Sequence, residues 1–254
     1  MRLFDSHAHY EDERFDEDRD EVLSSMHASG VERIVEIGCD LSGAKTAITI
    51  AEKYPFVYAA VGVHPQQAHE ASEDDFIALE ALYRHEKVVA VGEIGLDYHY
   101  EYAPRAVQKE VFARQLELAR HLDLPVCVHD REAHADTLDI LRAHPGVRGV
   151  FHSYSGSLEM TRDVLKLGFV FGFNGIITFK NAKKFEPIIK SLPPETILIE
   201  TDCPYLAPEP YRGRRNDSRY LYRACETVAA LRGIPDEEAA ELTFRNASRF
   251  YAIG

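Results

Sequence analysis

Seven side chains that could bind metal ions stand at the ends of apolar segments along the chain. They are His7, His9, His64, Glu93, His129, His152 and Asp202. Imidazole nitrogens and carboxylate oxygens are common ligands of divalent metals, and a pair of bound ions can activate water and neutralise charge on a phosphoryl or carbonyl oxygen. Each residue alone also suits a solvated loop or a hydrogen-bonded core position. A metal site therefore depends on whether the fold brings these residues together.

The segment 88–98, VVAVGEIGLDY, contains one acid, Glu93, within an apolar sequence. Four apolar residues at 88–91 predict a strand buried on both faces. An ionised carboxylate in a dry interior is costly unless a cation or a hydrogen-bond donor neutralises it. A metal ion is the first hypothesis for Glu93. The alternative, from this segment alone, is a strand end whose Glu caps the following turn.

Apolar segments alternate with amphipathic ones along the whole chain. Strands are expected at 3–9, 33–39, 56–64, 88–98, 124–130, 148–152, 169–174 and 197–202. Helices are expected at 16–29, 42–54, 74–86, 103–122, 132–143, 157–167, 184–192, 218–232 and 236–250, with Pro104 in the first helical position of the fourth. This order predicts a single-domain (β/α)8 TIM barrel over residues 1–254, with an extra C-terminal helix. The alternative is a doubly wound sheet, but the sequence HAHY at 7–10 is not its Gly-rich phosphate loop.

In such a barrel the carboxyl ends of all strands form one rim, where active sites are built. His7 and His9 end the first predicted strand, and His64, Glu93, His129, His152 and Asp202 belong to the ends of the third, fourth, fifth, sixth and eighth. Separate structural roles for these residues would require the same coincidence on six strands. The joint placement therefore favours a metal site over separate structural roles.

Four segments resemble the motifs of the TatD-type metal-dependent deoxyribonucleases, a branch of the metal-hydrolase barrels. They are HAH at 7–9, GEIGLDY at 92–98, HSYSG at 152–156 and ETDCPYLAP at 200–208. The resemblance implies a two-metal centre, with His7, His9, Glu93 and Asp202 around one ion and Glu93, His129 and His152 around the other. There are two departures from the family pattern. Tyr154 replaces a frequent Phe, and Ser218 stands where the family often has proline, which leaves the geometry of that loop open.

The resemblance implies a phosphodiesterase in which Glu93 bridges two divalent ions and Asp202 accepts a proton from the attacking water. Imidazole ligands favour Zn, Mn, Co or Ni over Mg, whereas relatives are typically described as Mg-dependent. The loop 211–220, YRGRRNDSRY, interleaves arginine with tyrosine, a composition that suits phosphates and unpaired bases. Expected substrate contacts are His64, Arg131, His134, Arg212 and Arg214. Alternatively, these arginines pair with nearby acids, and a salt bridge at a helix start accounts for Arg131 and His134.

We therefore expect a metal-dependent deoxyribonuclease, specifically a 3′–5′ exonuclease on single-stranded DNA ends, with RNA as a further candidate substrate. One rival is a metal-dependent hydrolase of a carboxylic ester, lactone, amide or aminoacyl-tRNA bond, which would use the same centre to polarise a carbonyl. A second rival is a metal-binding or nucleic-acid-binding protein without turnover. The possible base Asp202 argues against that reading, because binding alone does not need it.

Composition limits the class of protein further. The chain has 254 residues and a formal charge of -13, which argues against a protein that coats nucleic acid or membrane through its overall field. Its four cysteines lack C-x-x-C spacing and are expected to be reduced thiols. There is no signal-peptide pattern and no apolar stretch approaching the roughly 20 residues of a membrane span. We expect a cytoplasmic protein without membrane association, and nothing indicates an obligate protein partner.

Overall fold

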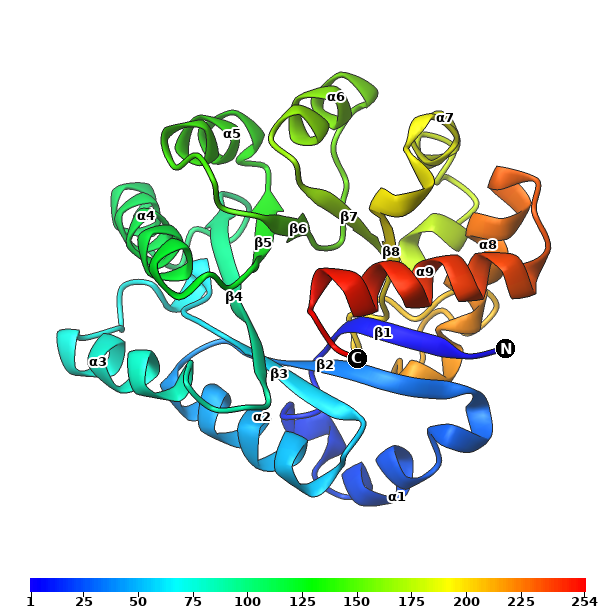
Figure 1. Cartoon of the computed structure of the whole chain (residues 1–254), viewed down its shortest axis with the longest axis horizontal. Helices are drawn as coiled ribbons and strands as arrows, with labels where there is room; N and C mark the ends of the chain where they lie inside the picture. Colours follow the sequence, from blue (N-terminus) through cyan, green and yellow to red (C-terminus); the bar gives the residue numbers. More distant parts are fainter. The chain divides into compact units, whose positions relative to one another are not determined.

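The computed structural model describes all 254 residues, in which strands and helices alternate along the chain (Figure 1). The strands are β1 Leu3–Ala8, β2 Val31–Gly38, β3 Val57–Val61, β4 Val88–Asp97, β5 Val126–Arg131, β6 Gly149–Phe151, β7 Val170–Phe173 and β8 Ile197–Ile199. The α-helices are α1 Arg19–Ser24, α2 Leu41–Lys53, α3 Glu73–Leu82, α4 Arg105–Leu122, α5 His134–Ala143, α6 Leu158–Lys166, α7 Phe185–Ser191, α8 Tyr222–Arg232 and α9 Asp236–Phe250.

The strands form one sheet in the order of the sequence, from β1 to β8. The pairs β1–β2, β3–β4, β4–β5, β5–β6 and β7–β8 are all parallel. A parallel bridge between Ala8 and Cys203 joins the end of β1 to the segment after β8. Parallel strands in sequential order with helices between them are the topology of a (β/α)8 barrel. The predicted fold class is confirmed, including the extra helix α9.

The chain divides into two compact units, residues 1–36 with 171–254, and residues 37–170. In the first unit, α9 packs against β1 and β8, and the Phe4 ring lies 5.9 Å from that of Phe244 and 6.0 Å from that of Tyr251. In the second unit, β4 lies between β3 and β5, and α4 packs on it. Every residue of β4 is buried, as predicted for this segment. The single-domain assignment stays a prediction.

Several predicted helix boundaries were wrong. The helix expected at 74–86 ends at Leu82, and the one expected at 218–232 begins with a separate 3-10 turn, Ser218–Tyr220, before α8. The helix expected at 16–29 is split into α1 and a 3-10 turn, His27–Ser29, which ends at Gly30 with a left-handed φ of 82°. Pro104 is the N-cap of α4 and not its first helical residue, because its ψ of 139° is extended while its carbonyl already accepts the N–H of Gln108 at 3.0 Å.

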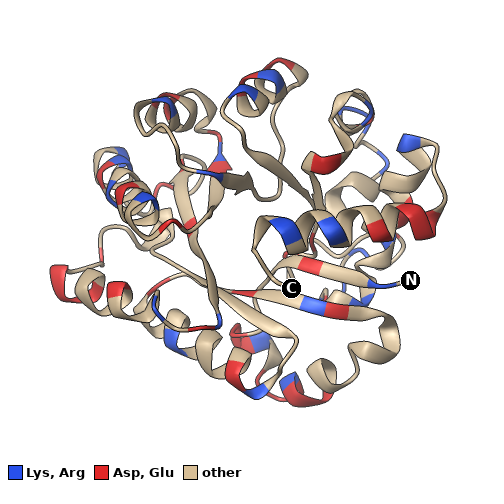
Figure 2. Cartoon of the chain, viewed as in Figure 1, with Lys and Arg blue, Asp and Glu red and all other residues tan.

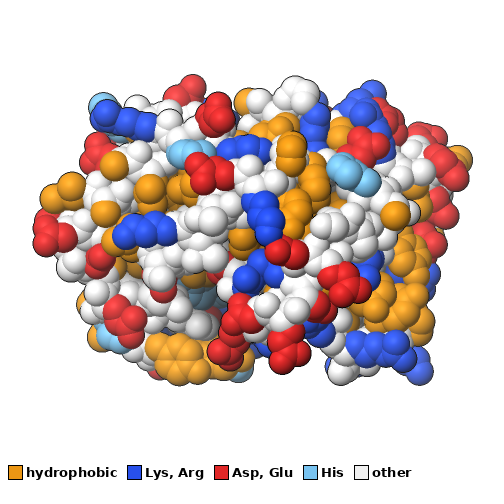
Figure 3. Space-filling view, turned by 90° about the horizontal axis from the view of Figure 1, so that it is seen from below, with side chains coloured by type: hydrophobic (Ala, Val, Ile, Leu, Met, Phe, Trp, Pro, Cys, Tyr) orange, Lys and Arg blue, Asp and Glu red, His pale blue; other side chains and the backbone are white.

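Charged side chains lie mainly on the helices and connecting loops, and the strands carry few of them (Figure 2). On the face shown in Figure 3, basic side chains are interspersed with acidic ones. Attraction of an anionic substrate to that face would therefore have to be local. None of the helices combines the length and apolar character needed to cross a membrane. None of the four cysteines forms a disulfide bond.

Candidate functional site

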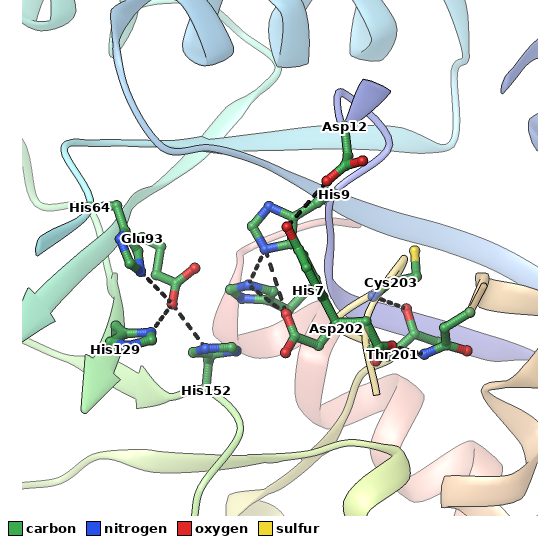
Figure 4. A network of polar contacts seen from close by, with 12 residues as sticks. His7, His9, Asp12, His64, Glu93, His129, His152, Thr201, Asp202 and Cys203 are labelled. Atoms are coloured by element: carbon green, nitrogen blue, oxygen red, sulfur yellow. Dashed lines mark hydrogen bonds and ion pairs between the residues drawn. The ribbon is translucent and has the colours of Figure 1, made fainter. Parts of the chain in front are cut away.

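The first unit brings together His7, His9 and Asp202 (Figure 4). The Nε2 atoms of the two imidazoles lie 3.1 Å apart, and Oδ1 of Asp202 lies 3.8 Å from His7 Nε2 and 3.5 Å from His9 Nε2. Ligands about 2.1 Å from one ion are about 3–3.5 Å from one another in tetrahedral geometry. The three side chains therefore have nearly the spacing that a shared cation requires. His7 is fully buried and His9 is 8% exposed.

Backbone pairing between β1 and the segment after β8 sets this geometry. The N–H of Asp202 donates to the carbonyl oxygen of His7 at 2.9 Å. The N–H of His9 donates to the carbonyl oxygen of Cys203 at 2.8 Å. Residues almost 200 positions apart in the sequence are thus held in register by two adjacent hydrogen bonds.

A buried hydrogen-bond network around Asp5 also connects β1 to the chain that follows β8. Its carboxylate accepts the N–H of Thr201 at 2.9 Å and the hydroxyls of Thr201 and Ser218 at 2.5 and 2.6 Å. Burial raises the pKa of Asp5 to about 7, although these hydrogen bonds act in the opposite direction. The Ser218 hydroxyl accepts from Tyr10 at 2.7 Å, and its N–H donates to Tyr10 at 2.9 Å. A proline at position 218 would have neither a hydroxyl nor a backbone N–H. These two hydrogen bonds to Tyr10 therefore depend on the serine.

Sequence reasoning missed two acids beside His9. Oε1 of Glu11 lies 3.3 Å from His9 Nδ1, the ring nitrogen opposite the one that faces His7. A carboxylate there can accept Nδ1–H and leave the Nε2 lone pair for a metal ion. Glu36 accepts the backbone N–H groups of Tyr10 at 3.0 Å and Glu11 at 2.7 Å. Burial raises the pKa of Glu36 well above its ordinary value, and the Glu11 carboxylate raises it further.

The second unit gathers three imidazoles around the carboxylate of Glu93 (Figure 4). Oε1 of Glu93 lies 2.5 Å from His129 Nδ1, 2.9 Å from His152 Nε2 and 3.7 Å from His64 Nε2. Burial alone lowers the pKa of His129, but the Glu93 and Asp97 carboxylates outweigh it and raise the pKa to about 9. Positive charge is thus favoured beside Glu93. Several imidazole nitrogens around one buried carboxylate form a set of ligands that suits a divalent cation.

Close packing between β4 and β5 positions this cluster. Gly95 pairs with His129, and its φ of 144° belongs to the region that favours glycine. A Cβ atom on Gly95 would collide with the carbonyl oxygen of His129. Asp97, two residues further on and also buried, places Oδ2 3.3 Å from His129 Nε2 and accepts from Gln66 at 2.8 Å. Its role was not predicted, although it lies within the GEIGLDY motif.

The predicted substrate residues on the second unit have different surroundings. His64 belongs to the Glu93 cluster, and its Nδ1 accepts the N–H of Gln66 at 3.2 Å. Arg131 is exposed at the end of β5, with its guanidinium 5.0 Å from the centre of the Tyr100 ring. His134 lies 2.8 Å from Asp130, which is the salt bridge weighed as the alternative.

The arginine loop of the first unit is only partly available to a substrate. Its arginines are Arg212, Arg214, Arg215 and Arg219. Arg215 forms an ion pair with Asp18 at 2.6 Å, and Arg219 forms one with Asp217 at 2.8 Å. Arg212 and Arg214 are exposed. Tyr211 and Tyr220 stack on each other with ring centres 4.1 Å apart, so each ring has one face covered.

Comparison with known proteins places this arrangement in a family. The profile of the family described as TatD related DNase matches residues 4–252. The chain belongs to this family. Membership makes the protein a metal-dependent hydrolase of TatD type.

Relatives within the TatD family match along essentially their whole length. The uncharacterized metal-dependent hydrolase YabD of Bacillus subtilis is 43% identical over 253 residues, which is 99% of each chain. The 3'-5' ssDNA/RNA exonuclease TatD of Cronobacter sakazakii is 32% identical, over 97% of this chain and 99% of its own. The crystal structure of YJJV, a TatD homolog from Escherichia coli K12, has a TM-score of 0.93 at 31% identity and covers 100% of this chain and 99% of its own.

Proposed function

We propose that this protein is a metal-dependent deoxyribonuclease that hydrolyses phosphodiester bonds, as a 3′–5′ exonuclease on single-stranded ends. The observation that carries the proposal is the buried Glu93 carboxylate, with three imidazole nitrogens within 3.7 Å of one of its oxygens. The exonuclease activity named for the Cronobacter relative supports the class of substrate, and it includes RNA.

The proposed centre would hold two divalent ions, for which Mg, Mn and Zn are the candidates. His7, His9, Glu93 and Asp202 would surround one ion, and Glu93, His129 and His152 the other. Glu93 has two carboxylate oxygens, so it could be a ligand of both ions. All six residues lie in the C-terminal half of a strand or within three residues of its end. In a (β/α)8 barrel such positions meet on one face, which supports a common centre.

Bound ions would supply positive charge to the phosphoryl oxygens and make a water molecule more acidic. Asp202 would serve as the proton acceptor, because it is a carboxylate whose backbone is fixed by the hydrogen bond to His7. His64, 3.7 Å from Glu93, orients the phosphate that is cleaved. Arg131, Arg212 and Arg214 pair with flanking phosphates, since guanidinium groups bind phosphate oxygens bidentately.

The test uses single-stranded DNA oligomers labelled at the 3′ or the 5′ end, with Mg or Mn, and compares wild type with Glu93→Ala. Stepwise shortening from the 3′ end by wild type, and its loss in the variant, is the expected result. Glu86→Ala is the matched control, because it removes an exposed carboxylate of the same unit. Circular dichroism establishes that all three proteins are folded.

If metal-loaded wild type cleaves neither labelled oligomer, the nuclease proposal is wrong. Ester, lactone and aminoacyl-tRNA substrates would then be tested at the same residues. Shortening from the 5′ end would support a nuclease but contradict the proposed 3′–5′ polarity.

A further inference from the structure

Two tyrosines project from the loop between β4 and α4. Tyr100 is 47% exposed and Tyr102 is 63% exposed, although both are large and mainly apolar. Their rings are nearly parallel, with an interplanar angle of 12° and centres 5.6 Å apart. We call this pair the tyrosine platform. An exposed aromatic pair of this kind calls for an explanation, since burying the rings would be favourable.

Buried hydrogen bonds hold the loop that carries the tyrosine platform. The side-chain amide of Gln108, 1% exposed, donates to the carbonyl oxygens of Asp97 at 3.0 Å and Ala103 at 2.8 Å. Its Oε1 accepts the N–H of Asp97 at 2.8 Å. One side chain therefore clamps both ends of the loop. The exposed rings are presented on an ordered backbone, so little conformational entropy would be lost when a ligand binds.

The tyrosine platform is also tied to the Glu93 cluster. Oδ1 of Asp97 accepts the N–H groups of His99 at 2.9 Å and Tyr100 at 3.1 Å, while its Oδ2 faces His129. A single carboxylate thus orients a candidate metal ligand and the first residues of the loop. The distance from the platform to the cluster is set by covalent geometry and these bonds.

The charges around the tyrosine platform suit an anion with aromatic rings. Arg131, two residues after His129 on β5, lies 5.0 Å from the centre of the Tyr100 ring. The nearby acids are engaged by bases, Glu101 by Arg105 at 2.5 Å and Glu132 by His99 at 2.8 Å. A cation beside stacked, exposed aromatic rings is the combination that binds phosphate and unpaired bases of single strands.

We propose that Tyr100 and Tyr102 stack against unpaired bases of a single-stranded nucleic acid whose phosphate is held by Arg131. This inference rests on the proposed nuclease function and identifies residues that would bind its substrate. The sequence favours Tyr211 and Tyr220 for stacking, but those side chains are less exposed than Tyr100 and Tyr102. Both pairs are stacked, with ring centres 4.1 Å apart for Tyr211 and Tyr220 and 5.6 Å apart for Tyr100 and Tyr102. The platform accepts any base, because every base has a π face.

The test measures binding separately from cleavage. Fluorescence anisotropy at one fixed low salt concentration compares two single-stranded oligomers with nuclease-resistant phosphorothioate linkages, one carrying bases and one abasic at every position. The protein is the metal-loaded full chain. Variants are Tyr100→Ala, Tyr102→Ala and Tyr102→Phe, with Ile77→Ala as a control that removes an exposed apolar side chain from α3.

We expect wild type to bind the base-carrying oligomer about 5- to 150-fold more tightly than the abasic one, which corresponds to stacking of about one base. Each alanine variant should lose most of that preference with unchanged affinity for the abasic oligomer. Tyr102→Phe and Ile77→Ala should bind as wild type does. Equal affinity of wild type for both oligomers, or an unchanged preference in both alanine variants, would overturn the proposal and leave the rings to another kind of partner.

The two proposals fail separately. Cleavage of DNA without any preference for the base-carrying oligomer would contradict the tyrosine-platform proposal and support the nuclease proposal. Base-dependent binding without cleavage would support the tyrosine-platform proposal and contradict the nuclease proposal.

Discussion

Oδ2 of Asp97 lies 3.3 Å from Nε2 of His129, while the other ring nitrogen of His129 lies 2.5 Å from Glu93. The two carboxylates therefore contact opposite nitrogens of one imidazole. If Asp97 accepts Nε2–H, the tautomer is fixed with the Nδ1 lone pair directed to the candidate metal position. Such partners commonly change metal affinity by about 10- to 100-fold.

The first prediction concerns this carboxylate. Asp97→Asn keeps an oxygen for the loop amides but can present an NH2 group to His129 Nε2, which favours the wrong tautomer. We expect metal affinity, measured by isothermal titration calorimetry, to fall by about 10- to 100-fold. Asp139→Asn, on the exposed side of α5, should bind metal as wild type does. Unchanged affinity in Asp97→Asn would show that the contact does not orient the imidazole.

The number of bound ions tests whether Glu93 bridges two of them. Metal analysis of desalted protein should give about two ions per chain for wild type and about one for His152→Ala. Glu93→Ala should retain less than one, because both ions lose a ligand. His144→Ala is the control, since its Nδ1 contacts the carbonyl of Ile140 and lies outside both clusters. Retention of one full ion by Glu93→Ala would contradict bridging.

Gly95 is predicted to be intolerant of any side chain. Its φ is positive and an added Cβ would meet the carbonyl oxygen of His129. Gly95→Ala should lower the free energy of unfolding by more than about 3 kcal/mol, through backbone strain and a clash. Gly146 has a φ of 89° but open space around it, so Gly146→Ala should cost only about 1–2 kcal/mol. Urea denaturation measures both, and equal losses would refute the steric argument.

The hydroxyl of Ser218 is predicted to stabilise the seam between β1 and β8. Ser218→Ala leaves the buried Asp5 carboxylate and Tyr10 hydroxyl each without one partner, which should cost about 1–3 kcal/mol. Ser191→Ala removes a similar hydroxyl bond, to Ile188, at an exposed position and should cost no more than about 0.5 kcal/mol. Thermal unfolding of the two variants should show the difference, and matching melting temperatures would contradict it.

The exposed arginines of the 211–220 loop should act on substrate binding alone. Arg212→Ala and Arg214→Ala should each raise KM for a single-stranded oligomer, leave kcat unchanged, and reduce the salt dependence of log affinity by about 0.7–1. Arg215→Ala should instead lower stability, because its guanidinium is engaged by Asp18. Steady-state kinetics at several salt concentrations separates these effects. An unchanged salt dependence in both variants would exclude the loop from phosphate binding.

The order of strands and helices and the residues of both clusters were predictable from the amino-acid sequence alone. A continuous apolar run and a period-3.6 pattern are both local, so β4 and α4 could be located from residues close together in the chain. Ligand types at strand ends were equally visible, as for His129 and Asp202. The motif resemblance added which of them would share an ion.

The hydrogen-bond partners of these residues could not be predicted from the sequence and follow from the three-dimensional arrangement of the strands. The contacts of Asp97 with His129, and of Ser218 with Asp5, join side chains 32 and 213 positions apart. The three-dimensional arrangement also decided which arginines of the 211–220 loop are engaged, since the partner of Arg215 lies 197 positions away. Sequence pattern reports which face of an element is apolar, whereas a hydrogen bond depends on distances of a few tenths of an ångström between elements. Those distances exist only once the strands are in register.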